Sequence, residues 1–163
     1  MMSAEKVLGV LDVFAHAGIV SWVDGGWGID ALLGTQTREH DDLDLVLDIR
    51  AVDQARTLLV GQGFIVERDW RPTALALRHL DGRKVDLQSG RDGGGDQVQP
   101  DGRRWHYDPP VTGRIAGHTV RCCSPACQLA AHLGYEPDEI DRADMAALAA
   151  RYQLTLPAPY EAG

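Results

Sequence analysis

The spacing of hydrophobic residues along the chain predicts a succession of helices and strands. Apolar side chains that recur at every third or fourth position are typical of amphipathic helices, and short alternating or β-rich segments are typical of strands. The segments predicted as helices are 4–17, 27–33, 52–59, 124–133 and 137–152. The segments predicted as strands are 19–23, 43–49, 64–67, 74–80 and 84–88.

Glycine, proline and serine mark the predicted turns and ends. Asp81-Gly82 predicts a hairpin between two of the strands, and a second hairpin is expected over 113–122. Ser124-Pro125 is a favourable helix start, with the helix ending at Gly134. The glycine-rich segment Gly90–Asp96 is predicted to be a turn or a mobile lid, because no strand-turn-helix context surrounds it. The tail over 156–159 is predicted to be loosely held.

The order of these elements predicts an α/β (α+β) fold with a short, mixed, twisted sheet flanked by helices. We expect a core over residues 1–110 and a small C-terminal hairpin and helical segment over 111–163 that packs on it. The chain has 163 residues and no internal repeat is visible.

Composition and charge narrow the possible partners. The formal net charge is −8 and the sequence pI is near 5.1, which argues against nucleic acid or anionic membrane as a partner. A cationic small substrate fits this charge, although many soluble proteins are simply acidic. The N-terminus lacks a basic region followed by an apolar stretch, so we expect a cytoplasmic protein. The clustered Cys122, Cys123 and Cys127 are expected to be reduced thiols, since a zinc site needs a better set of ligands.

Two carboxylates and a glycine pair are the first candidates for chemistry. Asp42 and Asp44 are two positions apart at the start of a predicted strand, so both side chains point to one face. Mg²⁺ is commonly held by one or two carboxylates together with substrate phosphates. Upstream, Gly25-Gly26 opens a predicted helix, whose free N–H groups suit a phosphate. This combination predicts phosphoryl or nucleotidyl transfer.

Asp86 is a candidate third acid. It lies on the return strand of the Asp81-Gly82 hairpin and joins Asp42 and Asp44 if that strand lies beside theirs. Three crowded acids repel one another unless a cation neutralises them. The alternative is that Asp86 is an exposed strand residue.

At these residues the chain resembles a known family. Gly25–Ala31, Leu33-Gly34, Thr37-Arg38-x-His40 and Asp41–Leu45 are similar to the signature of small antibiotic nucleotidyltransferases of the DNA polymerase beta-like superfamily. The similarity is greatest to the lincosamide nucleotidyltransferases, followed by the aminoglycoside 2″-nucleotidyltransferases. Weaker matches extend it over roughly residues 7–150, among them Glu67-x-x-Trp70-x-Pro72, Leu77-x-His79, Gln99-Pro100-x-Gly102, Ala126-x-Gln128-Leu129, His132-x-Gly134-Tyr135 and Asp141-x-x-Asp144.

The resemblance implies a fold, a reaction and roles for individual residues. It implies the polymerase beta-like nucleotidyltransferase fold, with Asp42 and Asp44 holding one or two Mg²⁺ ions on a nucleoside triphosphate. It implies that Asp86 serves as a metal ligand or as the general base on the acceptor. A nucleoside monophosphate, AMP first, would pass to a hydroxyl of a small antibiotic, a lincosamide first and an aminoglycoside second. Gln88 stands where the lincosamide enzymes tend to carry His, which leaves the acceptor open.

Four further residues near the Gly-Gly pair each have a functional and a structural interpretation. Arg38 is expected on a phosphate, or else in an ion pair with Glu39 or Asp41. His40 is equally a nucleotide contact or a hydrogen-bonding scaffold residue. Asp30 and Trp27 are predicted to be structural.

Acceptor recognition is predicted from aromatic side chains with a few polar groups, which suit a sugar-bearing amine. The candidates are Glu67, Trp70, Trp105, Tyr107 and Tyr135, and packing is the alternative for each.

Two rival functions remain open from the sequence. Gly26-x-Gly28-x-x-Ala31 matches a dinucleotide-binding fingerprint, although the acidic pattern around Asp42 does not suit one. A non-enzymatic nucleotidyltransferase-like module, such as an antitoxin, is the other alternative. We expect a monomer or a homodimer.

Overall fold

A computed structural model describes residues 1–91, 93–98, 102, 104–133 and 135–160. The helical segments are α1 (Ala4–His16), α2 (Gly25–Leu33), η1 (Ile49–Ala51), α3 (Val52–Gly61), α4 (Pro125–Ala131) and α5 (Glu139–Tyr152). The strands are β1 (Ser21–Asp24), β2 (Leu43–Asp48), β3 (Phe64–Trp70), β4 (Ala74–His79), β5 (Lys84–Gly90), β6 (Gly95–Val98), β7 (Arg104–Tyr107), β8 (Val111–Ile115) and β9 (His118–Cys122).

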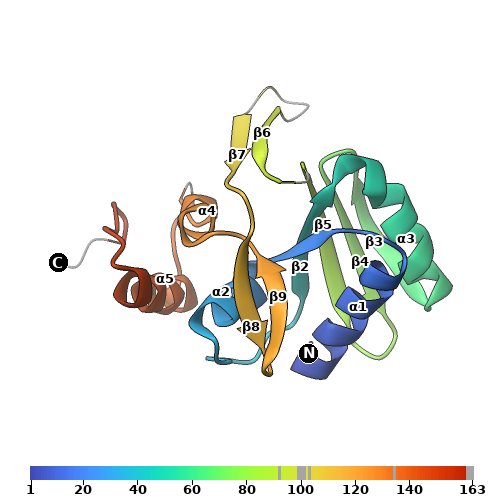
Figure 1. Cartoon of the computed structure of the whole chain (residues 1–163), viewed down its shortest axis with the longest axis horizontal. Helices are drawn as coiled ribbons and strands as arrows, with labels where there is room; N and C mark the ends of the chain where they lie inside the picture. The colour runs from blue at the N-terminus through green and yellow to red at the C-terminus, as the bar shows by residue number, and fades with distance from the viewer. Residues whose placement is uncertain (92, 99–101, 103, 134, 161–163) are drawn as a thin grey trace.

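Seven strands form one mixed sheet in the order β3-β4-β5-β2-β1-β9-β8. β2 runs parallel to β5 and β1 runs parallel to β9, whereas the other neighbours are antiparallel. The β8–β9 hairpin therefore extends the same sheet beyond β1, although β1 and β9 share just one paired position, Val23 with Cys122. The prediction of a twisted mixed sheet flanked by helices is confirmed (Figure 1).

One face of the sheet carries the main hydrophobic core. Alternate residues of β2, Leu43, Leu45 and Leu47, are buried against the apolar sides of α1 and α3. Phe14 of α1 and Leu59 of α3 are completely buried. Full burial of such a side chain stabilises the fold by about 1.5–3 kcal/mol. The hydrophobic pattern of the sequence is therefore satisfied on this face.

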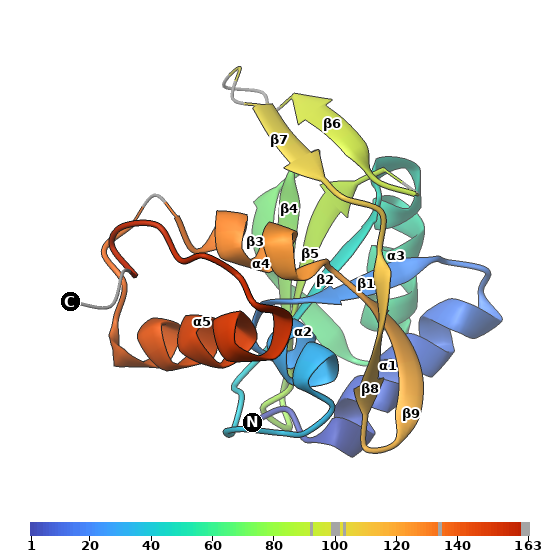
Figure 2. The same cartoon turned by 60° about the vertical axis from the view of Figure 1, so that its left-hand side comes forward.

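The opposite face carries a smaller cluster and a second, two-stranded sheet. Trp22 and Val46 meet Tyr107, Cys123 and Cys127 there. The indole of Trp22 lies edge-on to the ring of Tyr107, with centroids 6.0 Å apart. The β6–β7 hairpin that supplies Tyr107 projects from the main sheet (Figures 1 and 2). The three cysteines are buried free thiols.

The predicted helix start at Ser124-Pro125 is confirmed. The Ser124 hydroxyl accepts a hydrogen bond from the backbone N–H of Cys127 at 3.0 Å, and Pro125 occupies the first turn. α5 begins with a capping box, in which Asp138 and Asp141 bond each other's backbone N–H groups. Gly134, the predicted end of α4, lies outside the described residues, as do part of the Gly90–Asp96 segment and the Gln99-Pro100 pair.

The prediction of a loosely held tail is wrong. Tyr160 is 6% exposed, and its hydroxyl donates to the carbonyl of His132 at 3.0 Å. Arg142 of α5 donates to the carbonyl of Pro159 at 2.7 Å. A terminal aromatic side chain that reaches a buried site ties the segment down, and position along the chain does not reveal that site. Among the described residues, no helix combines the length and apolarity needed to cross a lipid bilayer.

Candidate active site

Strand register brings three acids into one row. Asp24 of β1 pairs with Asp44 of β2, and Asp44 pairs with Asp86 of β5. Paired residues on neighbouring strands project to the same face of a sheet, so the three side chains lie side by side. Asp42 precedes Asp44 by two positions and joins this face. The acids that the sequence proposed for one site, together with Asp24, therefore share the face opposite the main core.

Gly25 and Gly26, here called the glycine corner, lie at one end of the carboxylate row formed by Asp24, Asp42, Asp44 and Asp86. Gly25 has φ 57°, and a side chain added there would collide with the carboxylate of Asp44. Glycine is therefore required both by the left-handed backbone and by the close approach of Asp44. Because β1 ends at Asp24 and α2 begins at Gly25, the free N–H groups of the helix start open beside Asp44.

Burial and mutual repulsion raise the pKa values of three acids of the carboxylate row. Burial, followed in order of size by the negative charges of Asp42, Asp24 and Asp86, raises the pKa of Asp44 from 3.8 to about 8. Burial also raises the pKa of Asp24 and of Asp86, the latter with help from Asp42. Each carboxylate would ionise more readily beside a cation, because a cation offsets both burial and mutual repulsion.

The donor chemistry of the row suits a hard divalent cation. Among the described residues, no three His, Cys, Asp or Glu side chains converge as a ready-made metal cluster. The acids thus lie on one face and influence one another's charge, but they do not by themselves form a complete set of metal ligands. Hard divalent cations take oxygen ligands, which carboxylates and substrate oxygens can supply together.

Arg38 lies beside the glycine corner. A side chain at Gly26 would meet the Arg38 guanidinium and the His40 ring, so both groups pack directly on the start of α2. The Arg38 guanidinium is 34% exposed and pairs with Asp144 of α5, with Nη2 3.0 Å and Nε 3.3 Å from Oδ2. The sequence alternative of an ion pair with Glu39 or Asp41 named the wrong acids, because the fold brings α5 to this loop.

His40 and Asp30 form a buried pair. The His40 Nε2 lies 2.5 Å from Asp30 Oδ2, and the other oxygen of Asp30 accepts from Thr37 N and Thr37 Oγ1 at 3.0 and 2.6 Å. Trp27 packs against His40 with the rings tilted and their centroids 4.8 Å apart, and it is 2% exposed. Asp30 and Trp27 are structural, as predicted, and His40 sits in this hydrogen-bonded scaffold.

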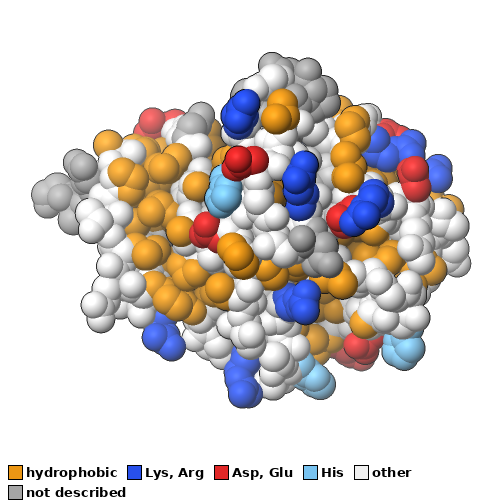
Figure 3. Space-filling view, turned by 45° about the horizontal axis from the view of Figure 1, so that its top comes forward, with side chains coloured by type: hydrophobic (Ala, Val, Ile, Leu, Met, Phe, Trp, Pro, Cys, Tyr) orange, Lys and Arg blue, Asp and Glu red, His pale blue; other side chains and the backbone are white. Residues whose placement is uncertain are grey.

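A cavity of about 330 Å³ adjoins the carboxylate row. It is lined by Asp24, Gly25, Asp44, Gln88, Trp105, Tyr107, Gln128, Ala131 and His132. Of the predicted acceptor residues, Trp105 and Tyr107 therefore line it. Figure 3 shows the face on which the hairpin stands, with acidic, basic and histidine side chains near its centre and a broad hydrophobic area on the side of α4 and α5.

The other predicted acceptor residues lie outside this cavity. Glu67 and Trp70 are on β3 at the edge of the sheet, where Trp70 is 55% exposed and Glu67 lies 3.4 Å from Arg78. Glu67 still influences the carboxylate row, because its charge contributes to the raised pKa of Asp86. Tyr135 packs near His132 with centroids 6.4 Å apart and donates to Asp141.

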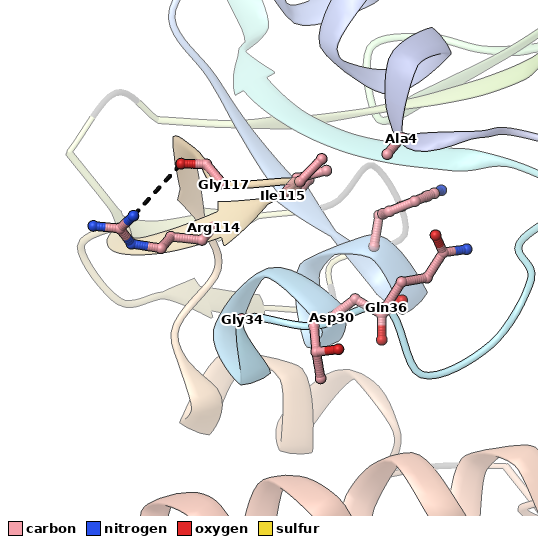
Figure 4. Close-up of a pocket in the computed structure, with 10 residues that line it drawn as sticks. Ala4, Asp30, Gly34, Gln36, Arg114, Ile115 and Gly117 are labelled. Carbon is pink, nitrogen blue, oxygen red and sulfur yellow. Dashed lines mark hydrogen bonds between the residues drawn. The ribbon is translucent and has the colours of Figure 1, made fainter.

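A second cavity lies on the far side of α2. It has a volume of about 240 Å³ and is bounded by Asp30, Gly34, Gln36 and the tip of the β8–β9 hairpin (Figure 4). Arg114 points away from Asp30 there and donates to the carbonyl of Gly117 at 3.5 Å. Since the Asp30 carboxylate is already occupied by Thr37 and His40, this cavity offers no free acid for chemistry.

Sequence reasoning missed three residues of the site. Asp24 directly precedes the Gly-Gly pair, and its position at the end of a predicted strand could have indicated that it belongs to the site. Gln128 appeared as a weak motif match, but its burial at 0% exposure depends on how α4 packs. Asp144 was likewise part of a weak motif, and its pairing with Arg38 spans 106 positions of the chain.

The fold and the site together define a nucleotidyltransferase. Its mixed sheet flanked by helices is shared with solved nucleotidyltransferases. The lincomycin-bound adenylyltransferase LnuA superposes with a TM-score of 0.81 at 30% identity, covering 90% of this chain and 96% of that one. ANT(2″)-Ia in complex with adenylyl-2″-tobramycin gives 0.74 at 19% identity, over 91% of this chain and 88% of that one, and supports the fold alone.

The chain belongs to the aminoglycoside-2″-adenylyltransferase family, whose model matches residues 6–148. It is 30% identical to a lincosamide resistance protein of Staphylococcus haemolyticus over 151 residues, which cover 88% of this chain and 92% of that protein. It is 67% identical to a 2″-aminoglycoside nucleotidyltransferase of Escherichia coli over 41 residues, which cover 25% of this chain and 22% of that protein.

These findings confirm the predicted family and the prediction of an enzyme, a nucleotidyltransferase of the antibiotic-modifying type. The dinucleotide-binding alternative is wrong, because β1 and β2 around the glycine corner are antiparallel, whereas that fingerprint belongs to a parallel βαβ unit.

Proposed function

We propose that the chain transfers AMP from ATP to a hydroxyl group of a lincosamide, with Mg²⁺ bound by Asp42, Asp44 and the triphosphate, and with Asp86 as a further metal ligand or as the general base. The observation that carries this proposal is the register that aligns Asp44 with Asp86 and places Asp24 and Gly25 beside them. When bound, the metal would neutralise phosphate charge and orient the triphosphate. The raised pKa of Asp44 supports such a role, since burial and like charge there call for a cation.

The glycine corner and Arg38 would hold the nucleotide. The first N–H groups of α2 lack partners within the helix and favour an anion. Arg38 lies against Gly26 at that point, and its planar guanidinium suits a phosphate oxygen. His40 would keep the Arg38 loop in place through its contact with Asp30.

Asp86 would accept the proton of the attacking hydroxyl. It is half-buried and lies two positions before Gln88 on β5, so both side chains project to the same face. Gln88 lines the cavity of Trp105 and Tyr107, so an acceptor seated there would bring a hydroxyl toward Asp86. A carboxylate whose pKa is raised by burial and by Asp42 is a better base than an ordinary surface acid.

The lincosamide is favoured by the relatives that match nearly the whole chain, the resistance protein of Staphylococcus haemolyticus and lincomycin-bound LnuA. An aminoglycoside is the second candidate, favoured by the family model and by the 67% identity over 41 residues. For both candidates the acceptor cavity is proposed to include Trp105 and Tyr107. We propose that the enzyme acts in the cytoplasm, where the nucleotide is available.

A pyrophosphate-release screen tests this function. Four nucleoside triphosphates are each offered with Mg²⁺ against lincomycin, clindamycin, several aminoglycosides and no acceptor. We expect release that depends on ATP, Mg²⁺ and a lincosamide, with a product heavier by one AMP by mass spectrometry. Release with aminoglycosides alone would establish the second candidate, and no release with any acceptor would contradict both.

A further inference from the structure

Three buried polar atoms of two residues that line the acceptor cavity have no partner among the described residues. They are both side-chain atoms of Gln128, Nε2 and Oε1, and Nε1 of Trp105. Both residues line the cavity beside Asp44, and Gln128 is completely buried at 0% exposure. Buried polar groups are almost always hydrogen-bonded in native proteins. Three unpartnered atoms on residues of one cavity therefore indicate a bound ligand.

Packing prevents Gln128 from turning away to find another partner. A side chain added at Gly28 would collide with Gln128 Nε2, which means that the amide lies directly on the backbone of α2. The helix that carries Gln128 is held in place by the Ser124 cap, and Ser124 donates to Asp108 at 2.6 Å. The amide is therefore fixed in position.

The unpartnered atoms define what the ligand must offer. An indole N–H is a donor only, and a glutamine amide presents one acceptor oxygen and an NH₂ donor. Their partner must supply hydrogen-bond acceptors and at least one donor. A hydroxyl or an amide does so, whereas an ammonium group has donors alone and would leave the Trp105 N–H and the Gln128 NH₂ unpaired.

We propose that Gln128 and Trp105 form a neutral subsite that selects acceptors by an uncharged hydroxyl or amide group and rejects an ammonium at that position. This subsite rests on the proposed function and deepens it, because it gives a physical reason for preferring a lincosamide over an aminoglycoside. A site built to hydrogen-bond a substrate group discriminates strongly, since the wrong substrate leaves buried groups unsatisfied.

The test measures acceptor binding apart from catalysis. Isothermal titration of lincomycin without nucleotide or metal is compared for the wild type, Gln128→Leu and Trp105→Phe, which keeps the aromatic ring but removes the N–H. We expect the lincomycin Kd to rise at least tenfold in Gln128→Leu and at least threefold in Trp105→Phe, with the KM for ATP changed less than twofold. Gln62→Leu, at an exposed position after α3, is the matched control and should behave as the wild type.

Gln128→Glu examines selectivity directly. We expect this variant to raise the ratio of aminoglycoside to lincosamide turnover at least tenfold, because a carboxylate in place of the amide favours an ammonium. An unchanged lincomycin Kd in folded Gln128→Leu and in Trp105→Phe would overturn the subsite while leaving the proposed function intact. Failure of the wild type to bind lincomycin at all would overturn the proposed acceptor and the subsite together.

Discussion

Asp30 lies within α2 and Asp44 lies beside the start of that helix, but the surroundings of the two carboxylates are opposite in kind. Asp30, within α2, is 1% exposed, and its two oxygens are taken by Thr37 and His40. Asp44 faces the start of α2, where burial and the charges of Asp42, Asp24 and Asp86 raise its pKa. A buried acid with a full set of partners belongs to the scaffold, whereas a buried acid among other acids is prepared for a cation and a substrate.

The two environments depend on each other through one short helix. The scaffold side fixes the Thr37–His40 loop through Asp30, and that loop leads directly into Asp42 and β2. The carboxylate side receives the free N–H groups of the same helix at Gly25. The comparison therefore separates two kinds of variant: one should abolish chemistry in a stable protein, and the other should weaken the fold while the chemistry remains.

The largest effect is expected for Asp44→Asn. This change removes the charge of a proposed metal ligand while keeping its shape, so turnover should fall by about 10³-fold or more, as for other groups that stabilise transition-state charge. Because the substitution also removes repulsion within the carboxylate row, the metal-free protein should be at least as stable as the wild type. Initial rates of pyrophosphate release and urea denaturation provide the two measurements.

Asp48→Asn is the matched control, since Asp48 ends the same strand and binds Arg50 at the surface. Its turnover should stay within threefold of the wild type. Near-normal turnover in Asp44→Asn would remove the metal assignment, and a large loss of stability there would place Asp44 in the scaffold with Asp30.

The next effect is expected for Asp30→Asn, on stability. A hydrogen bond to a buried charged group contributes about 1.5–3 kcal/mol, so the free energy of unfolding should fall by about 2–3 kcal/mol. Turnover per folded molecule, measured well below the melting temperature, should remain within about threefold. If turnover instead fell as far as in Asp44→Asn while stability held, the division between scaffold and site would be wrong.

The pH dependence of stability gives a smaller effect. An acid whose pKa is raised from 3.8 to about 8 is neutral in both folded and unfolded states at low pH. As pH rises above about 4 the unfolded carboxyl ionises while the folded one keeps its proton, so Asp44 lowers the free energy of unfolding progressively until about pH 8. The wild type should therefore lose stability relative to Asp44→Asn between pH 4 and 8, measured by urea denaturation in EDTA. A difference between the two proteins that does not change with pH would contradict the perturbed titration.

The sequence was sufficient for those parts of the fold that local pattern determines. Leu43, Leu45 and Leu47 alternate with Asp44, Val46 and Asp48, and this period of two predicted that the leucines and the carboxylates of Asp42 and Asp44 point to opposite faces. Ser124-Pro125 and Asp81-Gly82 marked a helix start and a hairpin, because capping and turn formation depend on adjacent residues. The family resemblance supported Asp86 as a third acid, but the register that pairs Asp44 with Asp86 is known from the structure alone.

Long-range contacts account for most of what the sequence did not reveal. Tyr160 reaches His132 and ties down the tail, and Arg38 reaches Asp144 rather than its neighbours Glu39 and Asp41. Both contacts depend on where α5 packs. The apolar residues of α5 are a poor guide to the face that this helix buries. Ile140 is apolar yet 49% exposed, whereas the acid Asp144 is 6% exposed. A buried acid within a helix is visible only once its partner is known.

The smallest effect, and the finest division between scaffold and site, is expected for Asp144→Asn. Asp144 holds Arg38 against Gly26 but does not itself face the carboxylate row, so it acts as a positioning residue. Loss of its charge should free the Arg38 guanidinium to move, and we expect the KM for ATP to rise about three- to tenfold with kcat changed less than threefold. Arg38→Lys should raise this KM further, because an ammonium cannot reproduce the fork of a guanidinium. The double variant should then be no worse than Arg38→Lys alone, because the carboxylate acts through the guanidinium. Steady-state kinetics on all three variants decide the matter: additive losses would show that Asp144 supports the site by a route other than Arg38.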